Sequence, residues 1–127
     1  MGELLWVGIG GAAGAVLRYL VSGHVQRQVQ HAGFPYGTLV VNVLGCLLIG
    51  FLTQVAQPTG RFASQSTLFA VVGALGAFTT FSTFSKEALD LFASGQVIAA
   101  LVDIGIHLAL GLTAVGGGYE LGRLLRR

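Results

Sequence analysis

The sequence predicts an all-α integral membrane protein with four transmembrane helices in a single domain, 1–127. Hydrophobic residues make up 54% of the chain and charged residues only 9%, with a mean hydropathy of +0.78. This composition lies well outside the range of soluble globular domains. Four apolar segments are each long enough to cross a bilayer as a helix, and no long polar segment remains for a soluble domain. We place the spans at about 4–21, 38–56, 65–92 and 96–121.

The first predicted span, 4–21, is a retained helix rather than a signal peptide. Glu3 is acidic where a signal peptide has a basic region, and the apolar run continues towards Arg18. Gly10 and Gly14 have the four-residue spacing of a small-residue helix face for close packing in membranes. Arg18 lies in the last turns of the span, and two interpretations of it stay open. It snorkels to the interface, or it anchors an aqueous vestibule that attracts anions.

A polar segment, 22–37, separates the first two spans, and we expect its first half to continue the first helix into the interface before the cluster of proline and glycine turns the chain back. The segment contains His24 and His31, for which we expect solvent-exposed roles. The second span, 38–56, is uncharged and carries an amide side chain, Asn42, near its start. Two interpretations of Asn42 stay open: a buried hydrogen bond between helices, or a donor to an anion at the mouth of a pore. Cys46, the only cysteine, is expected to pack as a small apolar residue.

The third predicted span, 65–92, contains the most unusual stretch of the chain, 73–85. Glycines, threonines and serines crowd weak helix formers and hydroxyl groups into this stretch at membrane depth. We therefore predict a helix break near 76–80, where freed backbone carbonyls could coordinate a cation. Helical spacing places Phe81 and Phe84 on adjacent turns of one face, close to the hydroxyls. A packing interface rich in phenylalanine is the plainer alternative.

The fourth predicted span, 96–121, carries Asp103 and His107, which are four residues apart and therefore on one face. This pair either forms a protonation-dependent ion pair along a solute route or bonds other helices. If the pair lines the route, we expect conductance to change between about pH 5.5 and about pH 7.5 and His107→Ala to abolish the change. Gly118 and Gly122 repeat the small-residue spacing near the end of the span.

The residue types favour passage of a small solute over catalysis. The sequence has no Ser-His-Asp spacing, metal-ligand cluster or phosphate-binding loop, so we expect no enzymatic activity. Phenyl edges are electropositive, and serine and threonine hydroxyls donate hydrogen bonds that partly replace the hydration shell of an anion. No carboxylate lies between Asn42 and Phe84 to attract a cation. The basic residues form no stripe, which argues against nucleic acid as a partner.

Positive charges are nearly balanced between the two expected sides of the membrane. The side of the termini carries Arg61, Arg123, Arg126 and Arg127. The other side carries Arg27 and Lys86, joined by Arg18 if that side chain reaches the interface. Four positive charges on the side of the termini against two or three on the other side only weakly favour cytoplasmic termini. We therefore expect insertion in both orientations, and two oppositely inserted copies would form an antiparallel pair.

Three motifs give the chain a resemblance to a known family. They are Gly73-Ala-Leu-Gly-Ala-Phe-Thr-Thr-Phe-Ser-Thr-Phe-Ser85, Gly14-Ala-Val-Leu-Arg-Tyr19 and Gly37-Thr-Leu-x-x-Asn-x-x-Gly45. In their order and over nearly the whole chain, these motifs resemble the bacterial fluoride channel family, Fluc, also called CrcB. The Thr-Thr-Phe-Ser-Thr-Phe string is the most specific of the signals.

The resemblance implies a passive fluoride-selective channel that exports cytoplasmic fluoride across the bacterial inner membrane. It also implies an antiparallel homodimer with dual topology, two pores at the subunit interface and a third helix broken in mid-membrane. The implied cofactor is a structural sodium ion at the dimer centre, held by the backbone carbonyls of Gly76 and Thr79. The implied partners are fluoride, membrane lipid and a second copy of the chain.

The same resemblance implies roles for individual residues. The implied pore residues are Phe81, Phe84, Asn42, Thr80, Ser82 and Thr83. Arg18 and Glu87 resemble a first-helix arginine and a glutamate near the polar track of the family. The fourth span departs from the family, because Asp103 and His107 stand where hydroxyl side chains are expected, which leaves the second half of the pathway open.

Two other functions remain as alternatives at this stage. A small dual-topology, proton-coupled multidrug transporter also has four spans and would use Asp103 as its membrane-embedded carboxylate. A partner subunit that does not conduct would need neither Phe81 nor Phe84, so the presence of both argues against it.

Overall fold

The computed structural model describes residues 2–29, 33–56 and 65–126. Its elements are α1 (Gly2–Gln28), α2 (Tyr36–Val55), η1 (Leu68–Leu75), α4 (Gly76–Phe78), α5 (Phe81–Ala93) and α6 (Val97–Leu125). Within these residues, four helical segments are long and apolar enough to cross a membrane: Gly2–Gln28, Tyr36–Val55, Gln65–Ala93 and Val97–Leu125. The prediction of an all-α protein with four such segments is confirmed. Three residues that entered the sequence predictions lie outside the described residues: His31, Arg61 and Arg127.

The first helix is longer than the predicted span, because α1 continues through a polar stretch to Gln28. Gln26 gives the physical reason. Its Nε2 donates a hydrogen bond to the backbone oxygen of Phe34 at 3.1 Å, and its Oε1 accepts one from the backbone N–H of Gly37 at 3.1 Å. One side chain thus satisfies two backbone groups at the start of α2. Polarity marked the edge of the apolar segment rather than the end of the helix.

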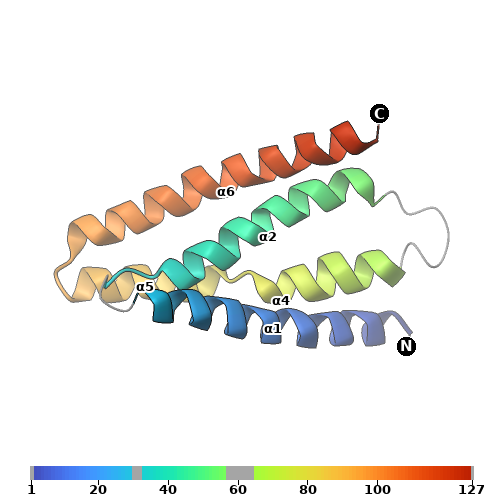
Figure 1. The fold of residues 1–127 in the computed structure, drawn as a ribbon. Coiled ribbons are helices and arrows are strands. Elements are labelled where there is room, and N and C mark those ends of the chain that lie inside the picture. Colours follow the sequence, from blue (N-terminus) through green and yellow to red (C-terminus); the bar gives the residue numbers. More distant parts are fainter. Residues whose placement is uncertain (1, 30–32, 57–64, 127) are drawn as a thin grey trace.

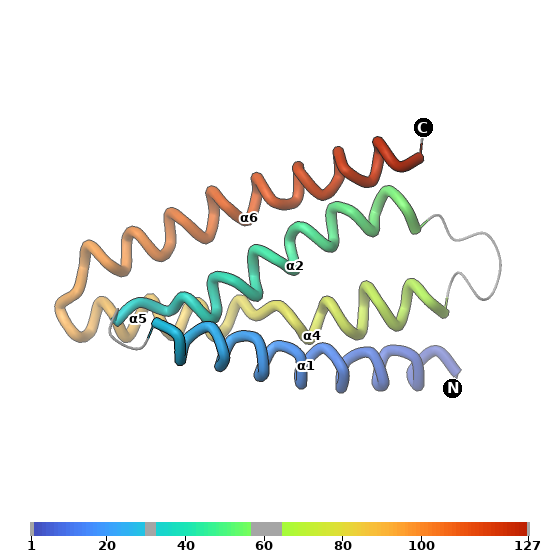
Figure 2. Tube along the Cα trace, in the orientation of Figure 1, coloured from blue at the N-terminus to red at the C-terminus, as the bar shows by residue number. Residues whose placement is uncertain are grey.

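The helices run in alternating directions along one bundle (Figure 1). α1 packs along η1 and α4, whereas the most extensive contact of α2 is with α6. The N- and C-termini lie at the same end of the bundle (Figure 1, Figure 2). An even number of antiparallel crossings requires this arrangement, so the expected placement of the two termini together is confirmed.

Glycines allow the backbones of both helix pairs to approach closely. A methyl group at Gly10 or Gly14 of α1 would clash with backbone carbonyl oxygens of η1. Across the other pair, a methyl group at Gly118 of α6 would clash with a backbone carbonyl oxygen of α2. The interpretation of the Gly10 and Gly14 pattern as a packing face is therefore confirmed, and close packing of this kind holds helices together in lipid.

Two extended residues, Thr79 and Thr80, separate α4 from α5. Their φ and ψ angles are −87° and 155° at Thr79 and −151° and 108° at Thr80. Upstream, η1 has the wide turns of a π-helix, and the backbone N–H of Gly76 donates to the carbonyl oxygen of Val71. Irregular turns of this kind frequently occur at functional sites. The segment between Gln65 and Ala93 thus consists of two helical arms that meet at the hydroxyl-rich stretch.

Candidate functional site

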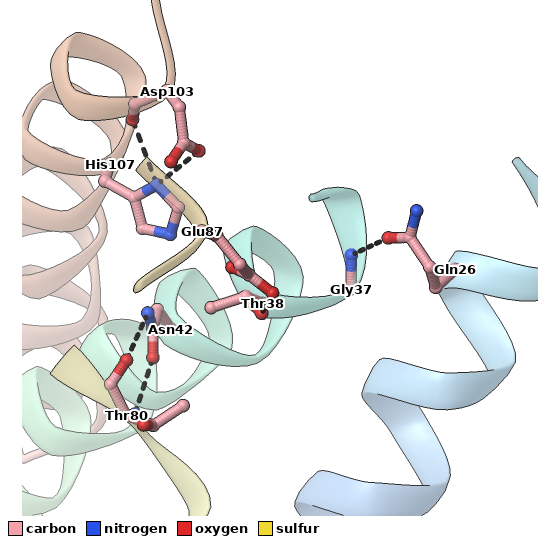
Figure 3. A network of polar contacts seen from close by, with 8 residues as sticks. All are labelled: Gln26, Gly37, Thr38, Asn42, Thr80, Glu87, Asp103 and His107. Atoms are coloured by element: carbon pink, nitrogen blue, oxygen red, sulfur yellow. Dashed lines mark hydrogen bonds and ion pairs between the residues drawn. The ribbon is translucent and has the colours of Figure 1, made fainter. Parts of the chain in front are cut away.

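Asn42 holds the extended residue Thr80 through both of its backbone groups. The Asn42 Nδ2 donates to the carbonyl oxygen of Thr80 at 3.2 Å, and its Oδ1 accepts from the Thr80 N–H at 2.8 Å (Figure 3). An extended residue that is half-buried among helices has no helical partner for these groups, and leaving them unpaired would be costly. The hydrogen bond between helices that was one interpretation of Asn42 is present. One Nδ2 hydrogen is not used by this pair.

Thr80 also caps the second helical arm. Its Oγ1 accepts a hydrogen bond from the backbone N–H of Thr83 at 3.2 Å, which is the usual geometry of a threonine N-cap. The same hydroxyl lies 3.0 Å from Thr83 Oγ1 and 3.3 Å from Ser82 Oγ. Three hydroxyl groups are therefore clustered at the start of α5, where the backbone N–H groups of a helix terminus also favour negative charge.

These two interactions alter the hydrogen bonding of the residues just upstream. In a continuous α-helix the N–H of Thr80 would donate to the carbonyl of Gly76, and the N–H of Thr83 to that of Thr79. The structure directs the first N–H to the Asn42 side chain and the second to the Thr80 hydroxyl. The carbonyls of Gly76 and Thr79 are therefore deprived of the donors that a continuous helix would supply.

The two phenylalanines at the start of α5 lie side by side but differ in exposure. The ring centroids of Phe81 and Phe84 are 5.5 Å apart, and the planes are tilted by 57°. Phe81 is 78% exposed on the protomer, whereas Phe84 is buried and its ring centroid lies 4.3 Å from that of His107 in α6. The predicted placement on adjacent turns is confirmed, and the pair extends from the protomer surface to its interior.

A cavity of about 400 Å³ brings most of the predicted site residues together. It is lined by Asn42, Gly45, Cys46, Ile49, Val71, Leu75, Gly76, Thr79, Thr80, Phe81, Phe84, His107 and Leu108. Its wall is apolar apart from a small number of amide, hydroxyl, thiol and imidazole groups. Ligand-binding cavities commonly have this composition. Cys46 is half-buried in this wall, so its packing also places a thiol in the cavity.

Arg18 lines a separate cavity of about 370 Å³ together with Arg27 and the hydroxyl-bearing Thr80 and Thr83. The Nε atom of Arg18 is buried and has no hydrogen-bond partner among the described residues. Thr80 lines both cavities, so the hydroxyl cluster stands between them. Arg18 therefore lies in a hollow beside the hydroxyls, and its role in a vestibule stays a prediction.

Glu87 lies one turn beyond the phenylalanines on α5 and is bonded to α2. Its Oε1 accepts a hydrogen bond of 2.7 Å from the hydroxyl of Thr38, which is 3% exposed. The other carboxylate oxygen is buried and has no partner among the described residues. Both residues line a third cavity, of about 700 Å³, at the end where α2 begins. The Thr38 partner was not predicted, because it lies 49 residues away in sequence.

Asp103 and His107 form a buried pair inside the protomer. The Asp103 Oδ1 lies 3.0 Å from the His107 Nδ1, and the two side chains are 0% and 7% exposed (Figure 3). The same Nδ1 lies 3.0 Å from the backbone oxygen of Asp103. Only His107 lines the cavity that holds the phenylalanines. His24, in contrast, is exposed on α1, as expected.

The fold and the site define a class: a multi-pass helical membrane protein with a largely apolar cavity, lined by a few polar groups, beside the extended residues Thr79 and Thr80. Residues 5–119 match the family described as "CrcB-like protein, Camphor Resistance (CrcB)". The chain belongs to this family, so the resemblance seen in the sequence is confirmed.

Relatives similar over almost their whole length are named "Fluoride-specific ion channel FluC". The protein of Elusimicrobium minutum is 45% identical over 125 residues, which cover 97% of this chain and 95% of the relative. That of Maridesulfovibrio salexigens is 41% identical and covers 98% of each chain. A Dehalococcoides mccartyi relative is 43% identical over 100% of this chain and 97% of its own. The family is therefore one of ion channels rather than enzymes.

Proposed function

We propose that this chain is the subunit of a passive, fluoride-selective channel that exports cytoplasmic fluoride. The observation that carries the proposal is the cavity in which Phe81 and Phe84 meet the amide of Asn42 and the hydroxyl of Thr80. Relatives at 41% and 45% identity that are named fluoride-specific channels support it. Family membership also favours a channel over the multidrug transporter and over a non-conducting partner subunit.

Neutral groups would coordinate fluoride along this path. The tilted rings of Phe81 and Phe84 can turn electropositive edges towards an anion, and Ser82 and Thr83 add hydroxyl donors. The unused Nδ2 hydrogen of Asn42 is a further donor. Together these groups replace part of the hydration shell without a fixed charge, so the ion binds weakly enough to leave. Arg18 would draw anions into the adjoining vestibule.

We propose an antiparallel homodimer with two such pathways at its interface, inserted in both orientations in the bacterial inner membrane. Phe81 is the strongest indication, because a pore residue that is 78% exposed on the protomer needs a second surface to enclose the path. A second copy of the chain is the partner that this surface fits. In this arrangement the interruption at Thr79 and Thr80 is the break of the third helix near mid-membrane, and lipid surrounds the remaining faces.

We further propose that a structural sodium ion sits between the two subunits on the backbone carbonyls of Gly76 and Thr79. The N–H groups that would bond these carbonyls in an α-helix donate elsewhere. The Thr80 N–H donates to the Asn42 side chain, and the Thr83 N–H donates to the Thr80 hydroxyl. Carbonyl oxygens are suitable ligands for a hard monovalent cation, and unwound segments of membrane helices commonly present them. The residues present therefore fit the ion, which would also hold the two interrupted helices together.

Passive efflux from liposomes tests the proposal. The purified protein is reconstituted, and initial efflux of fluoride and of chloride is measured with ion-selective electrodes for the natural chain, Phe81→Ile and Phe92→Ile. Phe92 is a matched control because it lies on the same helix but outside the cavity lining. We expect fast fluoride efflux and background chloride efflux. Phe81→Ile should reduce fluoride efflux on the order of tenfold, the effect of losing roughly 1.4 kcal/mol of ring contact.

The outcomes separate the functions. Fluoride efflux that survives in Phe92→Ile but is lost in Phe81→Ile supports the channel and places Phe81 on its path. A folded dimer that carries neither ion would contradict the proposed function. Equal efflux of fluoride and chloride would contradict the selectivity.

A further inference from the structure

His107 is oriented in the cavity wall by two acceptors on its own helix. Its Nδ1 lies 3.0 Å from the backbone oxygen of Asp103 and 3.0 Å from the Asp103 carboxylate. Because a backbone oxygen only accepts hydrogen bonds, its contact with Nδ1 requires a hydrogen on Nδ1 whether the ring is neutral or protonated. The carboxylate oxygen lies at ion-pair distance from Nδ1. The tautomer of the neutral ring is thereby set, and its Nε2 bears a lone pair.

The other ring nitrogen of His107, Nε2, faces a different environment. It is buried and has no hydrogen-bond partner among the described residues. In Figure 3 it points away from Asp103. The ring lines the same cavity as Phe81, Phe84 and Asn42. A buried polar atom without a partner is costly, and its usual explanation is a ligand, ion or water that occupies the space.

Whether Nε2 carries a proton determines whether an anion can bind there. The lone pair of a neutral ring repels an anion, whereas a protonated ring presents an N–H donor with a positive charge. We infer that His107 is a further fluoride-coordinating residue of the pathway, which donates from Nε2 only after it takes up a proton, with Asp103 as its positioning residue. This inference rests on the proposed function as a fluoride channel.

Ionisable groups face His107 from three helices. On its own helix, the Asp103 carboxylate lies beside Nδ1. On α5, Glu87 interacts electrostatically with both His107 and Asp103. On α2, the ionisable group in the shared cavity wall is the Cys46 thiol. Carboxylates stabilise an imidazolium, so the positive charge at His107 is offset.

The phenyl ring of Phe84 connects this charge to the fluoride path. The ring centroids of Phe84 and His107 are 4.3 Å apart with an interplanar angle of 41°. A cation close to an aromatic ring is attracted to it and can remain in an otherwise apolar wall. Protonation of His107 therefore adds a donor and a positive charge directly beside the ring pair. Fluoride conductance should rise as pH falls.

Fluoride currents in planar bilayers test the inference, because neutral HF carries no current. Currents are recorded with equal pH on both sides at about pH 7.5 and at about pH 5.5. We expect the natural chain to conduct more at the lower pH, on the order of tenfold, as one charge-assisted hydrogen bond would give. His107→Gln offers an amide donor that does not titrate, so its current should not depend on pH. His24→Gln, which changes an exposed histidine of α1, should retain the pH response.

Asp103→Asn tests the positioning role. The amide oxygen can still accept from Nδ1, but the negative charge that stabilises the imidazolium is gone. The midpoint of the pH response should move to lower pH while the response itself remains. A midpoint unchanged from that of the natural chain would overturn the role of Asp103.

Binding linkage gives a readout independent of current. The sequence has three histidines, so a variant with His24→Gln and His31→Gln keeps His107 alone. Its ring ¹⁵N signals in this variant are followed through a pH titration. If fluoride binds the protonated ring, added fluoride must move the titration of His107 to higher pH, because coupling between two ligands is reciprocal. Chloride at the same concentration is the control and should not move it.

The outcomes distinguish this inference from the proposed function. Three results would each overturn the inference and leave the channel intact. They are a fluoride current that does not depend on pH, a pH dependence that persists in His107→Gln, and a His107 titration that added fluoride does not shift. Absence of fluoride current at either pH from folded dimers would contradict the channel itself, and the inference with it.

Discussion

At the scale of single residues, Asn42 and Thr80 explain how an interrupted helix is stable inside a membrane protein. Extended residues expose backbone groups that lipid cannot satisfy. Asn42 pairs with both backbone groups of Thr80, and the Thr80 hydroxyl caps the helix that follows. Two side chains therefore replace the hydrogen bonds that the interruption removes.

We expect Asn42→Asp to destabilise the protein by about 2 kcal/mol, because a carboxylate accepts the Thr80 N–H but repels the Thr80 carbonyl oxygen. Thermal unfolding in detergent, followed by loss of the monodisperse species, measures the change. Thr53→Ala on the same helix is the control, because the partner of the Thr53 hydroxyl among the described residues is the Gly50 carbonyl of its own helix. Equal stability of Asn42→Asp and the natural chain would show that the pairing with Thr80 contributes little.

The N-cap predicts a difference between two substitutions at Thr80. Thr80→Ser keeps the hydroxyl that accepts from the Thr83 N–H, whereas Thr80→Val removes it. We expect Thr80→Val to cost about 1 kcal/mol of stability and Thr80→Ser to cost much less. The same unfolding measurement tests this expectation, and similar losses in both variants would contradict the cap.

At the scale of elements, glycines bring α1 against η1 and α6 against α2. Gly10 and Gly14 face backbone carbonyls of η1, whereas a methyl group at Gly8 or Gly11 would meet no atom of another described helix within 4 Å. The spacing in the sequence identified the packing face. The partner helix could not be predicted, because small-residue faces fit many partners equally well.

Gly10→Ala should destabilise the protomer by about 2 kcal/mol, since the new methyl group meets backbone that cannot move aside. Gly11→Ala is the matched control and should have little effect within the protomer. Unfolding in detergent compares the two variants directly. A larger loss for Gly11→Ala would place the more important contact outside the protomer, on the face that a second copy would cover.

At the scale of the whole molecule, the bundle brings both termini to one end, and the positive charges do not strongly favour either end. We therefore expect a reporter fused to the C-terminus to be found on both sides of the membrane. Changing Ser94 to Lys adds a positive charge to the turn after α5, at the opposite end, and should shift the population towards the orientation with that turn in the cytoplasm. A single orientation in both chains would contradict dual topology.

The sequence by itself determined the class of the fold, the four apolar helices, the small-residue face of α1 and the family. These depend on composition and on local spacing, which a chain carries wherever it folds. The sequence also predicted that the first helix continues into the polar segment, but its end at Gln28 depends on the partners that Gln26 finds in the following loop and helix. Only the tertiary structure decided that Asn42 pairs with Thr80, that Thr38 bonds Glu87, and that His107 shares a cavity with Phe84. Those contacts join residues on different helices, and no local pattern specifies which helix faces meet.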